Sequence, residues 1–62
     1  MLIKTKDDEI HDVVAMSVED GSFRLQWDIG KTTRMIVQYR LTNWDEWVEG
    51  VVKQNKHGTY LY

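Results

Sequence analysis

Acidic residues around His11 form the densest group of potential metal ligands in the chain. Four carboxylates lie within four residues of this histidine: Asp7, Asp8, Glu9 and Asp12. Oxygen ligands of this kind suit hard cations such as Ca²⁺. A calcium-binding loop also needs a glycine at its turn and a bidentate glutamate at its end, and neither stands at the required spacing. We therefore interpret the group as a solvated acidic connection and assign no metal ligand.

Candidate nucleophiles are equally isolated. Neither Ser17 nor Ser22 lies in a nucleophile elbow, and the two histidines stand at no spacing typical of a Ser-His-carboxylate relay. Residues 30–32 (Gly-Lys-Thr) resemble the end of a phosphate-binding loop, but Leu25 replaces the upstream glycine of that motif. We assign no catalytic residue and no cofactor, and we expect a protein that is not an enzyme.

Length and composition predict one small domain over residues 1–62. A chain of this size buries only about 60% of its unfolded surface, so its stability should be marginal. Without cysteine, neither a disulfide nor a thiolate zinc site can support the fold. No apolar run approaches the roughly 20 residues of a membrane span, and no signal peptide is recognisable. We expect a cytoplasmic protein that does not contact a membrane.

The elements that carry these residues begin with a predicted hairpin at Asp20-Gly21, a dipeptide typical of two-residue turns. Closing the strands there places apolar residues opposite one another on one face, in three pairs: Val18 with Phe23, Met16 with Leu25, and Val14 with Trp27. A shift of one residue would destroy this division, so the pattern predicts a defined register.

A third strand extends this hairpin into an antiparallel meander over residues 10–19, 22–29 and 33–41. A loop at Gly30 would set Met35 opposite Trp27, and Val37 and Tyr39 would follow on the same face. The buried face should then contain Val14, Met16, Val18, Phe23, Leu25, Trp27, Met35, Val37 and Tyr39.

One apolar sheet face needs a cover, and residues 43–56 are predicted to supply it as an amphipathic helix. Their apolar side chains recur at helical spacing, at Trp44, Trp47, Val48, Val51 and Val52. Together with the meander, this helix gives an α+β fold. We expect residues 2–5 to form a short strand at the sheet edge, and residues 60–62 to dock on the body or pair with that first strand.

Two features oppose the helix. Gly50 costs about 1 kcal/mol relative to alanine in a helix interior. Residues 55–58 (Asn-Lys-His-Gly) also resemble a hairpin turn that would join two strands. The alternative fold is an all-β small barrel.

The aromatic residues allow a second interpretation if residues 44–54 form a strand. Residues 37–39 (Val-Gln-Tyr) followed by residues 44–48 (Trp-Asp-Glu-Trp-Val) resemble a short signature of chromo-barrel (tudor-knot) domains. If residues 44–54 form a strand, Tyr39, Trp44 and Trp47 line an aromatic cage for a cation, and some members of the family that the signature resembles bind methyl-lysine. The preceding strands do not match that family, and Arg40-Leu41 replaces its usual Gly-Trp, so we assign no family.

The predicted meander gathers every arginine on the face opposite the apolar one. The candidate partner-binding residues on that outer face are Arg24, Arg34, Ile36, Gln38 and Arg40. Arginine binds carboxylates and phosphates through bidentate hydrogen bonds. The outer face is therefore the predicted working surface.

Two functions follow from this surface. The first is a small protein-binding module, of the kind that phages and mobile elements use as inhibitors or regulators of host machinery. Its expected partner is another protein, and we also expect a homodimer. The alternative is a domain that reads DNA with its three-stranded sheet, as in the arm-binding domains of phage integrases. A pI near 5.5 and the absence of lysine clusters disfavour the nucleic-acid hypothesis.

Overall fold

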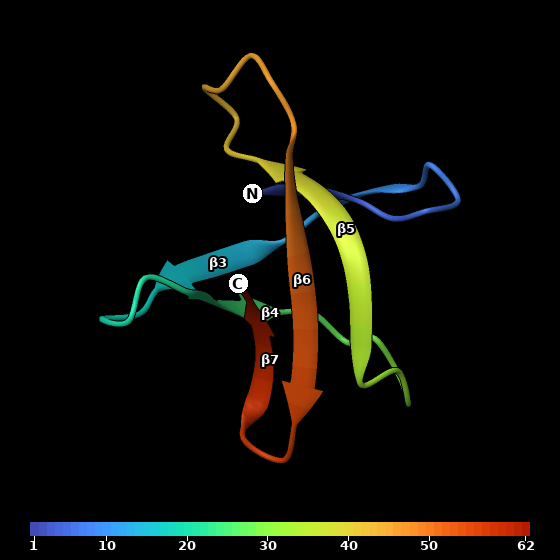
Figure 1. Cartoon of the computed structure of the whole chain (residues 1–62), viewed down its shortest axis with the longest axis vertical. Coiled ribbons are helices and arrows are strands. Elements are labelled where there is room, and N and C mark those ends of the chain that lie inside the picture. The colour runs from blue at the N-terminus through green and yellow to red at the C-terminus, as the bar shows by residue number, and fades with distance from the viewer.

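The computed structural model describes the whole chain, residues 1–62, as strands and turns without any helix. Its seven strands are β1 (Leu2–Lys4), β2 (Ile10–Asp12), β3 (Val14–Ser17), β4 (Phe23–Gln26), β5 (Arg34–Arg40), β6 (Val48–Asn55) and β7 (Gly58–Leu61). They form one antiparallel sheet in the order β2-β1-β5-β6-β7-β4-β3, which curls into a half-barrel (Figure 1). No part of the chain forms a helix long and apolar enough to cross a membrane.

A single bent stretch of chain connects the two edges of this sheet. β2 pairs with β1 at one edge, and β3 pairs with β4 at the other. Along the chain, only Val13 separates β2 from β3. The Val13 amide donates to the Met1 carbonyl at 2.8 Å, and the Met1 amino group donates back to the Val13 carbonyl at 3.0 Å. The chain therefore changes its partner strand directly after Val13, whose side chain enters the core.

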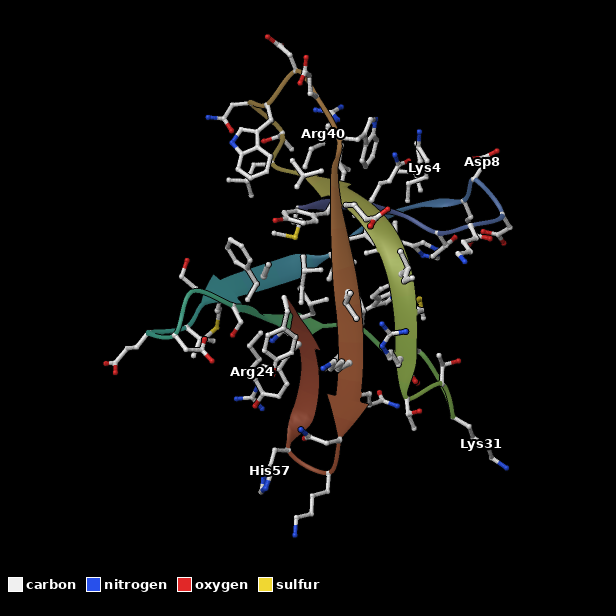
Figure 2. All side chains as sticks on the ribbon, viewed as in Figure 1. Lys4, Asp8, Arg24, Lys31, Arg40 and His57 are labelled. Atoms are coloured by element: carbon white, nitrogen blue, oxygen red, sulfur yellow. The ribbon has the colours of Figure 1, made fainter.

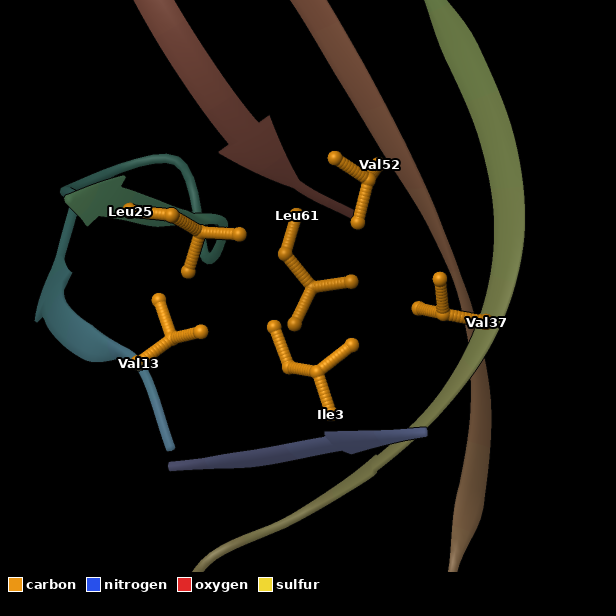
Figure 3. Packing of buried hydrophobic residues seen from close by; sticks show 6 residues of the cluster. All are labelled: Ile3, Val13, Leu25, Val37, Val52 and Leu61. Carbon is orange, nitrogen blue, oxygen red and sulfur yellow. The ribbon is translucent and has the colours of Figure 1, made fainter. Parts of the chain in front are cut away.

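The core lies inside the curl of the sheet and is small. Ile3 from β1, Val52 from β6 and Leu61 from β7 are completely buried. The buried apolar cluster is Ile3, Val13, Leu25, Val37, Val52 and Leu61 (Figure 3). Its members come from both ends and the middle of the sequence, so the core forms only when the terminal strands are in place.

The predicted helix over residues 43–56 is wrong, and the all-β small barrel is the fold that the structure supports. Residues 48–55 form β6, and a two-residue turn connects β6 to β7. The Asn55 side chain accepts a hydrogen bond from the His57 amide at 2.7 Å, and Gly58 takes a φ of +142°. The turn chemistry at 55–58 and the β-branched pair Val51-Val52 therefore outweigh the helical spacing of the apolar residues.

Gly50 explains why the segment is extended. A Cβ at this position would lie 2.8 Å from Cε1 of Tyr39 and 2.9 Å from Cδ1 of Leu61. Only a residue without a side chain lets the Tyr39 ring cross β6 on the inner face. The glycine that is unfavourable in a helix is required by the sheet.

The predicted three-stranded meander is also wrong, because β4 and β5 are not neighbours. β7 pairs with β4 and β6 pairs with β5, so the C-terminal hairpin separates them. β1 lies on the other side of β5. β1, predicted as a short strand at the sheet edge, is therefore an interior strand, and β7, which contains residues 60 and 61, pairs with β4 and β6 and not with β1.

The register of the β3–β4 hairpin differs from the predicted one by a single residue. Ser17 lies opposite Phe23 and Ala15 opposite Leu25, joined by a longer loop in place of a two-residue turn. Asp20 closes that loop by accepting hydrogen bonds from the Ser22 hydroxyl at 2.6 Å and from its amide at 3.0 Å.

This shift turns three side chains outward that were expected in the core. The exposed fractions are 60% for Val14, 59% for Met16 and 36% for Val18. The shift follows from Val13, the residue at which the chain stops pairing with β1 and begins to pair with β4. Because the Val13 side chain is buried, Val14 next to it faces outward. Leu25 and Val37 are buried as predicted.

Candidate functional site

A row of basic side chains crosses the outer face of the sheet, the face turned away from the core. Arg34 of β5 lies opposite Lys53 of β6, Lys53 lies opposite Tyr60 of β7, and Tyr60 lies opposite Arg24 of β4. Residues directly opposite each other in an antiparallel pair share a face. We call this set of four residues the basic row. No acidic side chain stands within it.

The charges of the basic row are not neutralised inside the molecule. The ion pairs of the structure join the N-terminus to Asp12 and Glu9 to His11, so no lysine or arginine takes part in one. Arg34 and Lys53 are like charges directly opposite each other, an arrangement that disfavours folding. Arg24 donates one hydrogen bond at 3.4 Å to the His57 carbonyl. The row therefore presents three cations that an external anion can neutralise.

The structure brings together only part of the predicted partner-binding set. Arg34, Ile36 and Gln38 alternate along the exposed side of β5, as the sequence predicts. Arg24 lies three strands away on β4 and reaches the same row only through β6 and β7. Figure 2 shows Arg24 and Arg40 near different ends of the molecule.

Arg40, the fifth predicted residue, is engaged with its own chain. Its Nη1 donates to the carbonyl of Trp44 at 2.9 Å, and more distantly to those of Leu41 and Thr42. The guanidinium carbon lies 5.2 Å from the ring centre of Trp47. These contacts hold the loop between β5 and β6, so Arg40 positions that loop and is not a free anion ligand.

Lys53 and Tyr60 belong to the site, although the sequence pattern did not predict them. The predicted helix over residues 43–56 placed Lys53 outside any sheet. It also left Tyr60 without the neighbouring strand, β6, with which it pairs. The signal that could have found them is the turn at 55–58, since a two-residue turn there sets Lys53 opposite Tyr60 by counting alone.

The aromatic residues do not form a three-sided cage around an open space. Tyr39 and Trp44 pack with ring centres 6.0 Å apart. Trp47 makes cation–π contacts with two side chains of the same chain, Lys4 and Arg40, and Lys4 Nζ lies 4.6 Å from its ring centre. The cation-binding surface of Trp47 is therefore occupied from within.

An open hollow of about 770 Å³ adjoins the basic row at Arg34. It lies between the β1–β2 hairpin and the segment after β4, where His11 packs on Trp27 with ring centres 5.1 Å apart. The hollow's one hydroxyl, on Thr5, donates to Asp7 and not to His11. That hydrogen bond lowers the pKa of Asp7. Nothing here pairs a nucleophile with a base, and nowhere do three potential metal-binding side chains converge.

Comparison with known proteins found no match among family models, curated proteins or solved structures.

Proposed function

We propose that this chain is a small protein-binding module whose outer sheet face binds an acidic surface of a partner protein. The basic row carries the proposal, because it places three unpaired cations in line across four strands. Neighbouring strands lie about 4.8 Å apart, so the row spans roughly 14 Å. A partner that presents carboxylates at this spacing would relieve the repulsion between Arg34 and Lys53 and form charge-assisted hydrogen bonds with both arginines.

The surroundings of the row fit a protein partner. Ile36 and Val51 lie opposite each other on the same face, two residues along each strand from Arg34 and Lys53. Protein interfaces combine such an apolar centre with aromatic and arginine contacts. Ile36 therefore belongs to the proposed contact surface, and Gln38 lies on the same face two residues further along β5, opposite Glu49.

The second candidate is binding of single-stranded nucleic acid, favoured by one observation. Tyr60 lies between two cations, and the exposed Tyr62 ring lies 5.5 Å from Lys53 Nζ. Alternating cations and aromatic rings can bind phosphates and stack bases. The net charge of −2 opposes this function, because it weakens the long-range attraction for a polyanion.

The test is an NMR titration of the ¹⁵N-labelled chain with a glutamate-rich peptide and, separately, with a single-stranded oligonucleotide. We expect the peptide to shift amides around Arg24, Lys53 and Tyr60. Lys53→Glu should weaken peptide binding at least tenfold, while Lys31→Glu, the same charge change in a loop outside the row, should have little effect. Equal effects of the two variants would contradict the site. Oligonucleotide binding that weakens steeply with salt would establish the nucleic-acid alternative instead.

A further inference from the structure

Strand β3 is an edge strand without the usual protection against pairing. Its sequence, Val-Ala-Met-Ser, contains no charge and no proline, and β3 ends the sheet. Val14 and Met16 are more than half exposed on its outer face, and Val18 follows at the same spacing. Natural edge strands normally carry a charge, a bulge or a cover that prevents pairing with another chain. The other edge strand, β2, contains Asp12 and His11.

The backbone groups that β3 leaves free can be identified from its register. The Val18 amide donates to the Ser22 carbonyl at 2.9 Å, so position 18 directs its N–H toward the β4 side of the hairpin, as a residue of a hydrogen-bonded pair does. Such pairs alternate with non-bonded ones along an antiparallel ladder. Val14, Met16 and Val18 therefore direct their backbone groups toward β4. Ala15 and Ser17 direct theirs away from the sheet.

We propose that β3 pairs with β3 of a second copy of this chain, in antiparallel orientation about a twofold axis at Met16. In this register Ala15 faces Ser17 of the partner and Ser17 faces Ala15 of the partner, so all free groups of both residues find a partner. Met16 meets its own copy, and Val14 meets Val18 of the partner. A strand with four free backbone groups at two alternate positions is complementary to itself.

Neighbouring registers leave more backbone N–H and C=O groups of β3 without a hydrogen-bond partner. A register centred on Ala15 would pair Ser17 with Val13, but the backbone of Val13 is already bonded to Met1. A register centred on Ser17 leaves both Ala15 residues unpaired. Only the register centred on Met16 forms four intermolecular hydrogen bonds and sets all six exposed apolar side chains in cross-strand pairs on the outer face.

The size and charge of this interface predict how fast the dimer dissociates and how it responds to salt. Two four-residue strands bury less than the roughly 1,200 Å² of a stable complex, so the dimer should exchange rapidly with monomer. Asp12, Glu19 and Asp20 flank β3 in each copy, so added salt should strengthen the dimer by screening their repulsion. Because Met16 lies opposite Arg24, the dimer would also join two basic rows end to end. The dimer itself does not depend on the function proposed for those rows.

Sedimentation velocity over a wide concentration range tests the proposal. The mass of the wild-type chain should rise from 7.4 kDa toward twice that value. Met16→Lys should abolish the rise, because it places two like charges on the axis. Ser17→Pro should do the same by removing a free N–H while leaving the ladder to β4 intact. Ile10→Lys is the matched control on β2, because Ile10 is also an exposed apolar residue, with 54% of its surface accessible. This variant should dimerise like the wild type.

Amide hydrogen exchange in the wild-type chain gives a second measurement that needs no variant. The Ala15 and Ser17 amides should become protected as concentration rises, whereas the Met16 amide, bonded to β4, should be protected throughout. A monomer at every concentration would overturn the proposal. So would a dimer that survives Met16→Lys, or one that Ile10→Lys abolishes.

Discussion

Arg34 and Arg40 lie on the same strand and the same face, yet they make different contacts. Arg34 is exposed, and its side chain takes part in no ion pair of the structure. Arg40 is half-buried and donates to three carbonyls of the loop between β5 and β6. The residue type alone does not distinguish a free cation from one that supports a loop.

We predict that Arg40→Met destabilises the fold by about 1–2 kcal/mol, because the carbonyls of the loop lose their charged donor. Arg34→Met removes the same charge from the same strand and should change stability by no more than about 0.5 kcal/mol. Urea unfolding of both variants measures the difference. Equal losses would show that the hydrogen bonds of Arg40 contribute nothing beyond its charge.

Asp20 gives the fold a dependence on acid. Hydrogen bonds from the Ser22 hydroxyl and amide hold the pKa of Asp20 below its ordinary value. A carboxylate with a lowered folded pKa stabilises the fold above its unfolded pKa of about 4, and this contribution disappears as the pH falls through the folded value.

We therefore predict that Asp20→Asn is less stable than the wild type at pH 7, and that the two converge as the pH falls through the lowered pKa of Asp20. Urea midpoints across this range measure the effect. Lys31→Gln, a charge change in another exposed loop, is the control and should keep a constant difference from the wild type. A gap between Asp20→Asn and the wild type that persists at low pH would exclude the carboxylate as its source.

At the scale of single elements, the register of the β3–β4 hairpin decides which side chains support the core. Leu25 is 5% exposed, whereas Val14 on the neighbouring strand is 60% exposed. The alternative two-residue turn would bury both. Substitution can therefore distinguish the two registers in solution.

Leu25→Ala should cost about 2–5 kcal/mol, a large part of the stability available to a domain of this size. Val14→Ala should change stability by no more than about 0.5 kcal/mol, since its side chain remains in water. Thermal unfolding followed by circular dichroism measures both at a low concentration, where self-association is minimal. A large loss for Val14→Ala would favour the two-residue turn and contradict the observed register.

At the scale of the whole molecule, the ends of the chain occupy interior places in the sheet. β1 lies between β2 and β5, and β7 lies between β6 and β4. Leu61, the second-to-last residue, is completely buried. The fold therefore depends on contacts between residues far apart in the sequence, and both terminal strands connect its two halves.

We predict that deleting residues 60–62 unfolds the chain, because β4 and β6 lose the strand that joins them and the core loses Leu61. Tyr62→Ala is the control. It retains the backbone hydrogen bonds with Val51 and removes only an exposed ring, so it should cost no more than about 1 kcal/mol. Far-ultraviolet circular dichroism distinguishes the two results. A folded truncated chain would show that β7 is dispensable.

Local alternation in the sequence determined the face that each residue of β5 presents. Met35, Val37 and Tyr39 point inward while Arg34, Ile36 and Gln38 point outward, as a period of two requires. This part of the candidate site was predictable, because side-chain direction within a strand depends only on the strand itself. The strands at 10–19, 22–29 and 33–41 were likewise located approximately, as β2 with β3, β4 and β5.

Only the tertiary structure decided which strands are neighbours. Residues 48–55 carry apolar side chains that suit either a helix or a strand, and the choice depends on Gly50 meeting Tyr39 and Leu61 across the sheet. The insertion of β6 and β7 between β5 and β4 then placed Lys53 and Tyr60 between Arg34 and Arg24. Strand pairing joins residues far apart in the chain and is favoured by the core as a whole, so no local pattern specifies it.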